Sequence, residues 1–173
     1  IMFALLSNKP YKKIDKTAND EPTTINKIKG DTKLTYMSEN LDQLIADSSF
    51  IIEGIATEKQ DDLIFQTVPF VTTNIKIKKV LKGNLTYKEI TLLQTKITED
   101  PLVKKGGRVL LFLEKYEGPI INDAYVCKGL YQGNYNINDK GIITNSIDLK
   151  NYNLKLSDDL EKTNSLEGLQ VKI

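Results

Sequence analysis

One feature constrains the fold of this chain more than any other: residues 71–78 alternate along the chain in the manner of a β-strand. A period of two residues is typical of a strand with one face on a core and one face in water. One face of the predicted strand carries Val71, Thr73, Ile75 and Ile77, and the other carries Thr72, Asn74, Lys76 and Lys78. The chain therefore contains at least one long strand that lies on a core.

Several further segments have the composition of strands. Residues 108–113 form a largely apolar run after a glycine pair, which is typical of a strand buried on both faces. Residues 50–57 are rich in β-branched side chains and contain Gly54, which predicts a bulge or a sharp bend. The charged residues 58–62 predict a turn. The remaining predicted strands are residues 90–94, 125–126, 134–138 and 141–144, with a hairpin turn at 138–141.

These short strands do not alternate with long helices, and this order predicts a mainly β fold. We expect a small antiparallel Greek-key barrel of the OB type, for which five strands are enough. A β-sandwich is the alternative. Residues 1–37 are polar and rich in lysine over most of their length, and they predict a flexible N-terminal arm. Residues 38–173 then form a single β-barrel domain with a short C-terminal helix.

Two short helices are expected at the ends of this domain. Asn40 is a suitable N-cap for the first helix, and Gln43 is the reciprocal partner three residues later. The apolar residues of this helix share one face, which we expect to cap the barrel; they are Leu41, Leu44 and Ile45. Ser157 is predicted to cap the C-terminal helix, whose first turn would carry acidic residues.

The composition excludes several kinds of active site. The chain has no histidine, so it has neither a Ser-His-Asp nor a Cys-His nucleophile and no histidine-ligated zinc. Cys127 is the single cysteine, which excludes an intramolecular disulfide and a thiolate cage, and we expect it in the core. The formal net charge is +1 and Arg108 is the single arginine, which disfavours a nucleic-acid partner. We expect that the protein is not an enzyme and that it binds neither a metal nor a cofactor.

The order of features resembles a known group of proteins. A short helix leads into the segment Ser48–Gly54, and the long strand ends at Val80-Leu81-Lys82-Gly83. Further along the chain, Gly106-Gly107 precedes the apolar segment Leu110–Leu113. Gly129 is then followed by the segment Tyr131–Tyr135. This order resembles exported or lipid-anchored proteins of Gram-positive bacteria without assigned activity. Their barrel is similar to the netrin-like domain, which is the OB-type fold of tissue metalloprotease inhibitors.

The resemblance covers roughly residues 38–145 and consists of glycine and apolar positions. It implies the fold and an exported location, secreted or anchored at the cell surface. Metalloprotease inhibition is not implied, because those inhibitors use disulfides and a free N-terminal cysteine, whereas Cys127 stands in mid-chain. The apolar residues 1–6 are too few to span a membrane, and they are either the end of a signal or anchor or simply the place where the sequence begins. The first interpretation predicts a membrane tether upstream of residue 1.

Tyrosines and a glutamine close together in the sequence form the candidate binding site. Tyrosine provides a rigid contact area with a hydrogen-bonding tip, which suits the recognition of a protein or a glycan. The simpler interpretation is that these rings cover the edge of the barrel. The candidate binding residues are Tyr125, Tyr131, Gln132 and Tyr135.

Other polar clusters have simpler explanations. The acidic residues Glu58, Asp61 and Asp62 lack the glycine of a calcium loop, and a solvated turn explains them. Asn136, Asn138 and Asp139 fit the chemistry of a hairpin turn better than that of an ion site. A basic stripe lacks the aromatic partners that single-stranded nucleic acid would need, and it consists of Lys76, Lys78, Lys79 and Lys82.

The sequence therefore predicts a non-enzymatic, extracytoplasmic binding module whose partner is a cell-envelope protein or glycan. One alternative is a glycan hydrolase that uses carboxylates alone, with Glu53 as the candidate because it stands among apolar residues of its strand. A further alternative is an OB domain that binds single-stranded nucleic acid.

Overall fold

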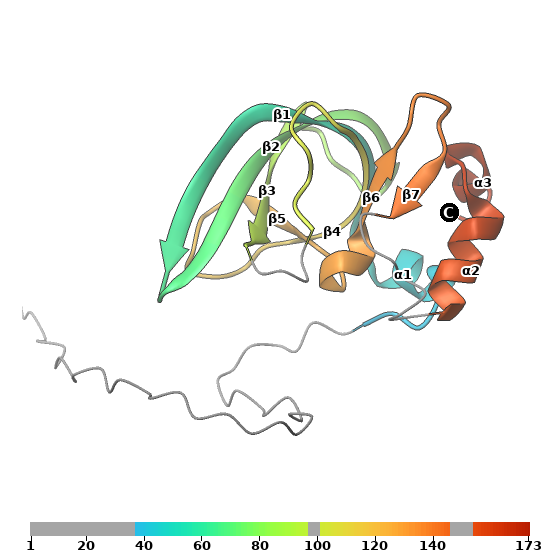
Figure 1. Ribbon diagram of the computed structural model, residues 1–173, viewed down its shortest axis with the longest axis horizontal. Helices are drawn as coiled ribbons and strands as arrows, with labels where there is room; N and C mark the ends of the chain where they lie inside the picture. Colours follow the sequence, from blue (N-terminus) through green and yellow to red (C-terminus); the bar gives the residue numbers. More distant parts are fainter. Residues whose placement is uncertain (1–36, 97–100, 146–153) are drawn as a thin grey trace, which may run out of the picture. The chain divides into compact units, whose positions relative to one another are not determined.

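The computed structural model describes residues 37–96, 101–145 and 154–173. The chain divides into two units, residues 1–31 and 32–173, and all described residues belong to the second. The strands of this unit (Figure 1) are β1 (Phe50–Phe65), β2 (Val68–Lys82), β3 (Glu89–Thr95), β4 (Arg108–Lys115), β5 (Ala124–Cys127), β6 (Asn134–Ile137) and β7 (Ile143–Asn145). The helices are α1 (Leu41–Asp47), the 3-10 helix η1 (Leu130–Gly133), α2 (Leu154–Thr163) and α3 (Leu166–Gln170). The predicted arm lies outside the described residues apart from Met37.

Within the described residues, five strands close on one another into a ring. The ring runs β1-β2-β3-β5-β4 and closes because β1 pairs with both β2 and β4. β6 and β7 continue the sheet from β4. The predicted mainly β fold with a few short helices is confirmed. One pair in the ring is parallel, with Thr91 of β3 opposite Ala124 of β5, so the sheet is mixed rather than wholly antiparallel.

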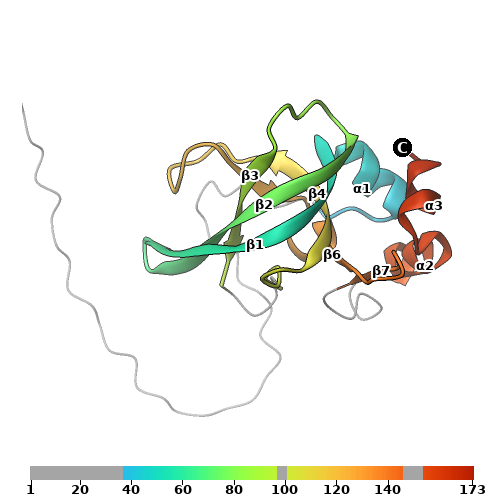
Figure 2. The same cartoon turned by 90° about the horizontal axis from the view of Figure 1, so that it is seen from above.

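The first two strands are longer than the sequence predicts. The turn predicted at residues 58–62 is wrong, because β1 continues through these residues to Phe65. The hairpin turns instead at Gln66 and Thr67, which both have positive φ angles (47° and 72°), the mark of a tight two-residue turn. The pairing of β1 with β4 ends at Ile55, and the β1–β2 hairpin extends beyond it (Figure 2). Charged side chains are compatible with such a solvated strand edge.

β4 separates two apolar clusters, because its successive side chains point to opposite faces. The first cluster, which we call the ring interior, collects side chains from all five ring strands, among them Ile52, Ile75, Leu92, Leu111 and Tyr125. The second, which we call the helix-covered cluster, lies on the other face of β4 and joins Leu110 and Phe112 to the helices. The prediction of a strand buried on both faces is confirmed for residues 109–113.

The helices pack against the helix-covered cluster. The predicted cap of α1 is confirmed, since the Asn40 side chain accepts a hydrogen bond from the Gln43 amide at 2.9 Å. Leu41, Leu44 and Ile45 are buried as predicted, but against the outer face of β4 rather than over the ring interior. Figure 1 shows α2 and α3 beside β7 on the same side of the sheet.

The predicted cap at Ser157 is wrong. Ser157 lies within α2, which already begins at Leu154, and it is buried. Burial of the apolar side chains decides this boundary, because Leu156 is completely buried and Leu160 packs against the same cluster one turn later. The serine that does cap a C-terminal helix is Ser165, whose hydroxyl accepts a hydrogen bond from the Gly168 amide at 3.1 Å.

Two glycine predictions are confirmed. The register of β1 against β2 shifts next to Gly54, and a Cβ there would lie 2.5 Å from the Ile75 side chain. In the turn at 138–141, Gly141 has a φ of 75°, and the Asn138 side chain accepts hydrogen bonds from the Lys140 and Ile142 amides. In the described part of the chain, no helix has the length and apolar character that crossing a membrane requires.

Candidate functional site

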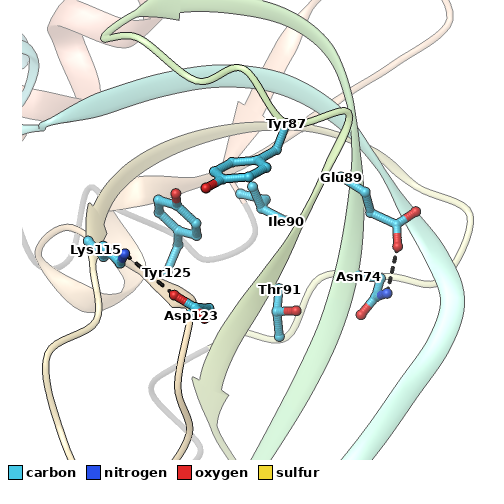
Figure 3. A pocket seen from close by; sticks show the side chains of 8 residues that line it. All are labelled: Asn74, Tyr87, Glu89, Ile90, Thr91, Lys115, Asp123 and Tyr125. Atoms are coloured by element: carbon cyan, nitrogen blue, oxygen red, sulfur yellow. Dashed lines mark hydrogen bonds and ion pairs between the residues drawn. The ribbon is translucent and has the colours of Figure 1, made fainter.

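A pocket of about 270 Å³ lies where β2, β3 and β5 meet the loops at the ends of β2 and β4. It combines aromatic, charged, amide and hydroxyl side chains, and Figure 3 shows them from close by. The lining residues are Asn74, Tyr87, Glu89, Ile90, Thr91, Lys115, Asp123 and Tyr125.

The pairing of the strands positions these side chains. Asn74 of β2 is the cross-strand partner of Thr91 of β3. The parallel pairing of β3 with β5 then brings Tyr125 next to Leu92, and Tyr125 is also opposite Lys115 at the end of β4. Residues from the β2–β3 part of the chain and from the β4–β5 part therefore meet at one place, and the parallel pairing of β3 with β5 joins them.

Two polar pairs lie within the pocket, one on each side of β3 (Figure 3). On the β2 side, the Asn74 amide donates a hydrogen bond to the Glu89 carboxylate at 2.6 Å. On the β5 side, the Lys115 ammonium lies 3.5 Å from the Asp123 carboxylate. Both pairs are open to solvent, with the Lys115 and Asp123 side chains 54% and 90% exposed. The electrostatic energy of the ion pair is therefore small.

Two tyrosines with different surroundings border the pocket. Tyr125 is 6% exposed, and its ring packs edge-on against Phe50 with a centroid distance of 5.6 Å. Tyr87 lies in the loop before β3 and is 66% exposed. The ring of Tyr125 is thus held by the core, whereas the ring of Tyr87 is available to a ligand.

The charge of the pocket restricts what it can bind. Its lining contains two carboxylates, Glu89 and Asp123, and one ammonium group, that of Lys115. An anionic ligand is therefore disfavoured. Within the described ranges, no group of three or more acidic, cysteine or histidine residues is placed to hold a metal ion.

The structure separates the four candidate binding residues of the sequence. Tyr125 alone lines the pocket. Tyr135 is completely buried in the helix-covered cluster, where it packs edge-on against Phe112 at a centroid distance of 5.7 Å. Tyr131 is half-buried against the same cluster.

Gln132 holds the start of the domain in place. Its side-chain oxygen accepts a hydrogen bond from the Ser38 amide at 2.8 Å, and its amide group donates one to the Ser38 carbonyl at 2.9 Å. The side chain is completely buried. Gly129, with a φ of 61°, leaves room for it, since a Cβ at that position would lie 2.5 Å from the Gln132 oxygen. This side chain is thus fully engaged within the protein.

The surroundings of Tyr135 affect its titration. Burial raises the pKa of its hydroxyl far above the ordinary value of 10.0, and the nearby Cys127 raises the pKa further. The hydroxyl has no hydrogen-bond partner among the described residues. Tyr135 therefore remains protonated in the folded protein at alkaline pH.

Other residues singled out in the sequence have structural contacts. Glu53 is 12% exposed and accepts a hydrogen bond from the Arg108 guanidinium at 2.8 Å, so the single arginine serves an ion pair. Lys82 donates to the Ile45 and Ala46 carbonyls at the end of α1, at 2.5 and 2.9 Å. Lys76, Lys78 and Lys79 are exposed.

Two further clusters also have structural positions. Cys127 is buried in the ring interior, as expected of a core residue. Asp62 forms an exposed ion pair with Lys96. Glu58 and Asp61 are exposed on β1, in line with the expected solvated role although not in a turn.

Sequence reasoning missed most of the pocket. Asn74 and Thr91 belong to predicted strands and Glu89 directly precedes one, and exposed polar residues are ordinary at such positions. The signal that could have indicated the site is Tyr87, because a large ring in a polar loop between two strands has no core to fill.

No protein-family model matches this chain, and no curated protein does. Neither a family nor an activity is therefore available from a relative.

Proposed function

We propose that this protein is a non-enzymatic binding module of the cell envelope and that the pocket around Tyr87 is its ligand site. The observation that carries the proposal is the exposed Tyr87 ring beside two polar pairs in a single pocket. Aromatic rings and a few well-placed polar groups are the usual components of a site that recognises a small ligand.

The architecture supports the same site by analogy. In OB-type barrels, the face of the second and third strands and the loop between the fourth and fifth strands bind oligonucleotides or oligosaccharides. The pocket draws on β2, β3 and the loop that ends at Asp123, before β5. Its two carboxylates disfavour the phosphates of an oligonucleotide. We accordingly favour a cell-envelope ligand, in line with the resemblance to exported netrin-like proteins of Gram-positive bacteria.

A co-sedimentation experiment tests this function. The full chain is mixed with insoluble cell-wall material from Gram-positive bacteria, and bound protein is measured after centrifugation. We expect the wild type to sediment with the material and Tyr87→Ala to remain largely in solution. Ile64→Ala is the matched control, because Ile64 is 81% exposed on the β1–β2 hairpin and does not line the pocket. Absence of wild-type binding, or equal binding by Tyr87→Ala, would overturn the proposal.

A specific observation also favours the second candidate, a glycan hydrolase. Glu89 and Asp123 line the same pocket, and a pair of carboxylates is the minimum for glycoside hydrolysis. Both are exposed, however, and each contacts a polar partner, whereas the acid of such enzymes lies in an apolar environment. Mass spectrometry of oligosaccharides incubated with the wild type and Glu89→Gln separates the two functions. Cleavage by the wild type alone would establish the enzyme; intact oligosaccharides in both samples support the binding module.

A further inference from the structure

We infer that the ligand of the pocket is a neutral glycan, with one sugar ring stacked on Tyr87 and its hydroxyl groups held by the two polar pairs; this inference rests on the proposed function. Charge, hydrogen-bonding pattern, aromatic exposure and size each contribute to it.

Charge selects among glycans. The lining carries one positive and two negative side chains, so a uronic acid or a phosphate-bearing polymer would meet a net repulsion. Lys115 lies beside Asp123 and partly neutralises it, and Glu89 is paired with a neutral amide. The pocket therefore lacks the positive potential that an acidic glycan needs. It also lacks the two uncompensated carboxylates that would attract a polycation.

The hydrogen-bonding pattern matches adjacent hydroxyl groups. Every sugar hydroxyl both donates and accepts, and each polar pair places a donor side chain next to an acceptor carboxylate. Asn74 uses one of its amide hydrogens on Glu89 and retains another, and Lys115 has two ammonium hydrogens beyond the one directed at Asp123. Each pair holds a donor and an acceptor side by side, so two adjacent hydroxyl groups of one sugar can bond to both.

Tyr87 supplies the apolar platform. A pyranose ring has an apolar face of C–H groups, and such a face packs on an aromatic ring without requiring charge. Tyr87 is 66% exposed and borders the same pocket as Thr91, whose hydroxyl lies between the two polar pairs in Figure 3. A ring stacked on Tyr87 would thus have polar groups around its rim.

The volume fits one ring. About 270 Å³ lies just below the usual range of ligand pockets, about 300–1,000 Å³, which favours a small group such as one sugar ring over a long oligomer. The competing ligand is a quaternary ammonium group, which would need a cage of several aromatic faces. Tyr125 is 6% exposed and packed against Phe50, so Tyr87 is the ring with an accessible face in this pocket.

A titration with defined probes tests the inference. The ¹⁵N-labelled full chain is titrated with neutral oligomers of glucose and of N-acetylglucosamine, with oligogalacturonate, and with choline chloride, and amide shifts are followed by NMR. We expect saturable shifts around residues 87–91 and 123–125 with a neutral oligomer and none with the other two probes. Tyr87→Ala should weaken binding by about 3- to 10-fold, whereas the control Ile64→Ala, outside the pocket, should leave it unchanged.

The outcomes separate this inference from the proposed function. Shifts with choline alone would replace the glycan by a quaternary ammonium ligand, and shifts with oligogalacturonate would overturn the charge argument. If no oligosaccharide shifts the pocket but cell-wall binding still depends on Tyr87, the neutral-glycan inference fails and the binding module remains. If neither experiment depends on Tyr87, both fail.

Discussion

The pocket and the helix-covered cluster contain the same residue types in opposite situations. Tyr135 and Gln132 belong to the helix-covered side, where both are completely buried and the Gln132 side chain bonds to the Ser38 backbone. Tyr87, at the pocket, is 66% exposed beside polar pairs that are open to solvent. At the helix-covered cluster, then, aromatic and amide groups stabilise the fold, whereas at the pocket they are available for recognition.

The difference comes from what covers each face. Three short helices lie over the outer face of β4 and exclude water from it. Among the described residues, no helix contributes to the lining of the pocket. The role of an aromatic or amide residue here is therefore decided by whether helices cover it, and not by its residue type. Each of the following predictions tests this difference, beginning with the largest expected effect.

Gln132→Ala should lower the free energy of unfolding by about 2–4 kcal/mol, because it removes two buried hydrogen bonds to the Ser38 backbone. Urea denaturation followed by circular dichroism measures the loss. Gln170→Ala is the matched control, since Gln170 is exposed at the end of α3 and its replacement should change stability by less than about 0.5 kcal/mol. Equal effects of the two substitutions would show that Gln132 has no structural role.

Tyr135→Phe should remove an alkaline loss of stability. The pKa of Tyr135 is raised in the folded protein, so above pH 10 the unfolded chain releases a proton that the folded protein retains. Unfolding of the wild type is therefore favoured as the pH rises, and its stability relative to Tyr135→Phe should fall by about 1.4 kcal/mol between pH 8 and pH 11. Urea unfolding at both pH values measures this difference.

At neutral pH, Tyr135→Phe should be as stable as the wild type or more stable, because the buried hydroxyl has no partner among the described residues. A variant that is destabilised at pH 7, or that keeps the same alkaline loss, would contradict the assigned surroundings of Tyr135.

Tyr87→Ala should have the smallest effect on folding, with a change of less than about 0.5 kcal/mol in the free energy of unfolding. Its ring is mostly in water, whereas Tyr125→Ala removes a ring packed on Phe50 and should cost about 3 kcal/mol. Thermal and urea unfolding of both variants measure the contrast. A large destabilisation by Tyr87→Ala would make that ring a structural residue and remove the basis for its role in binding.

Much of the fold could be predicted from local sequence. The alternation at residues 71–78, the apolar run at 109–113 and the Asn40 cap all appear where expected, because each depends on near neighbours in the chain. The predicted turn at residues 58–62 failed because hydrogen bonding to β2 extends β1 through a charged segment. The predicted cap at Ser157 failed because burial of Leu156 extends α2 backwards.

Less of the site could be predicted. The sequence indicated Tyr125, which lines the pocket. It grouped Tyr125 with Tyr131, Gln132 and Tyr135, which pack on the helix-covered side instead. Neighbours in sequence such as Tyr131 and Gln132 follow the chain into η1, away from β5. The partners of Tyr125 in the pocket come instead from β2, β3 and the end of β4, and no local pattern links these segments.

Three properties of this protein follow from its sequence alone: its β-rich character, the absence of histidine chemistry and the strand that is buried on both faces. Periodicity and residue chemistry are local properties, and they need no knowledge of what packs against them. Only the tertiary structure decided which polar and aromatic residues meet, because the parallel pairing of β3 with β5 joins Asn74, Tyr87 and Asp123 across about 50 residues of chain. Long-range pairing of this kind is set by the packing of the whole ring.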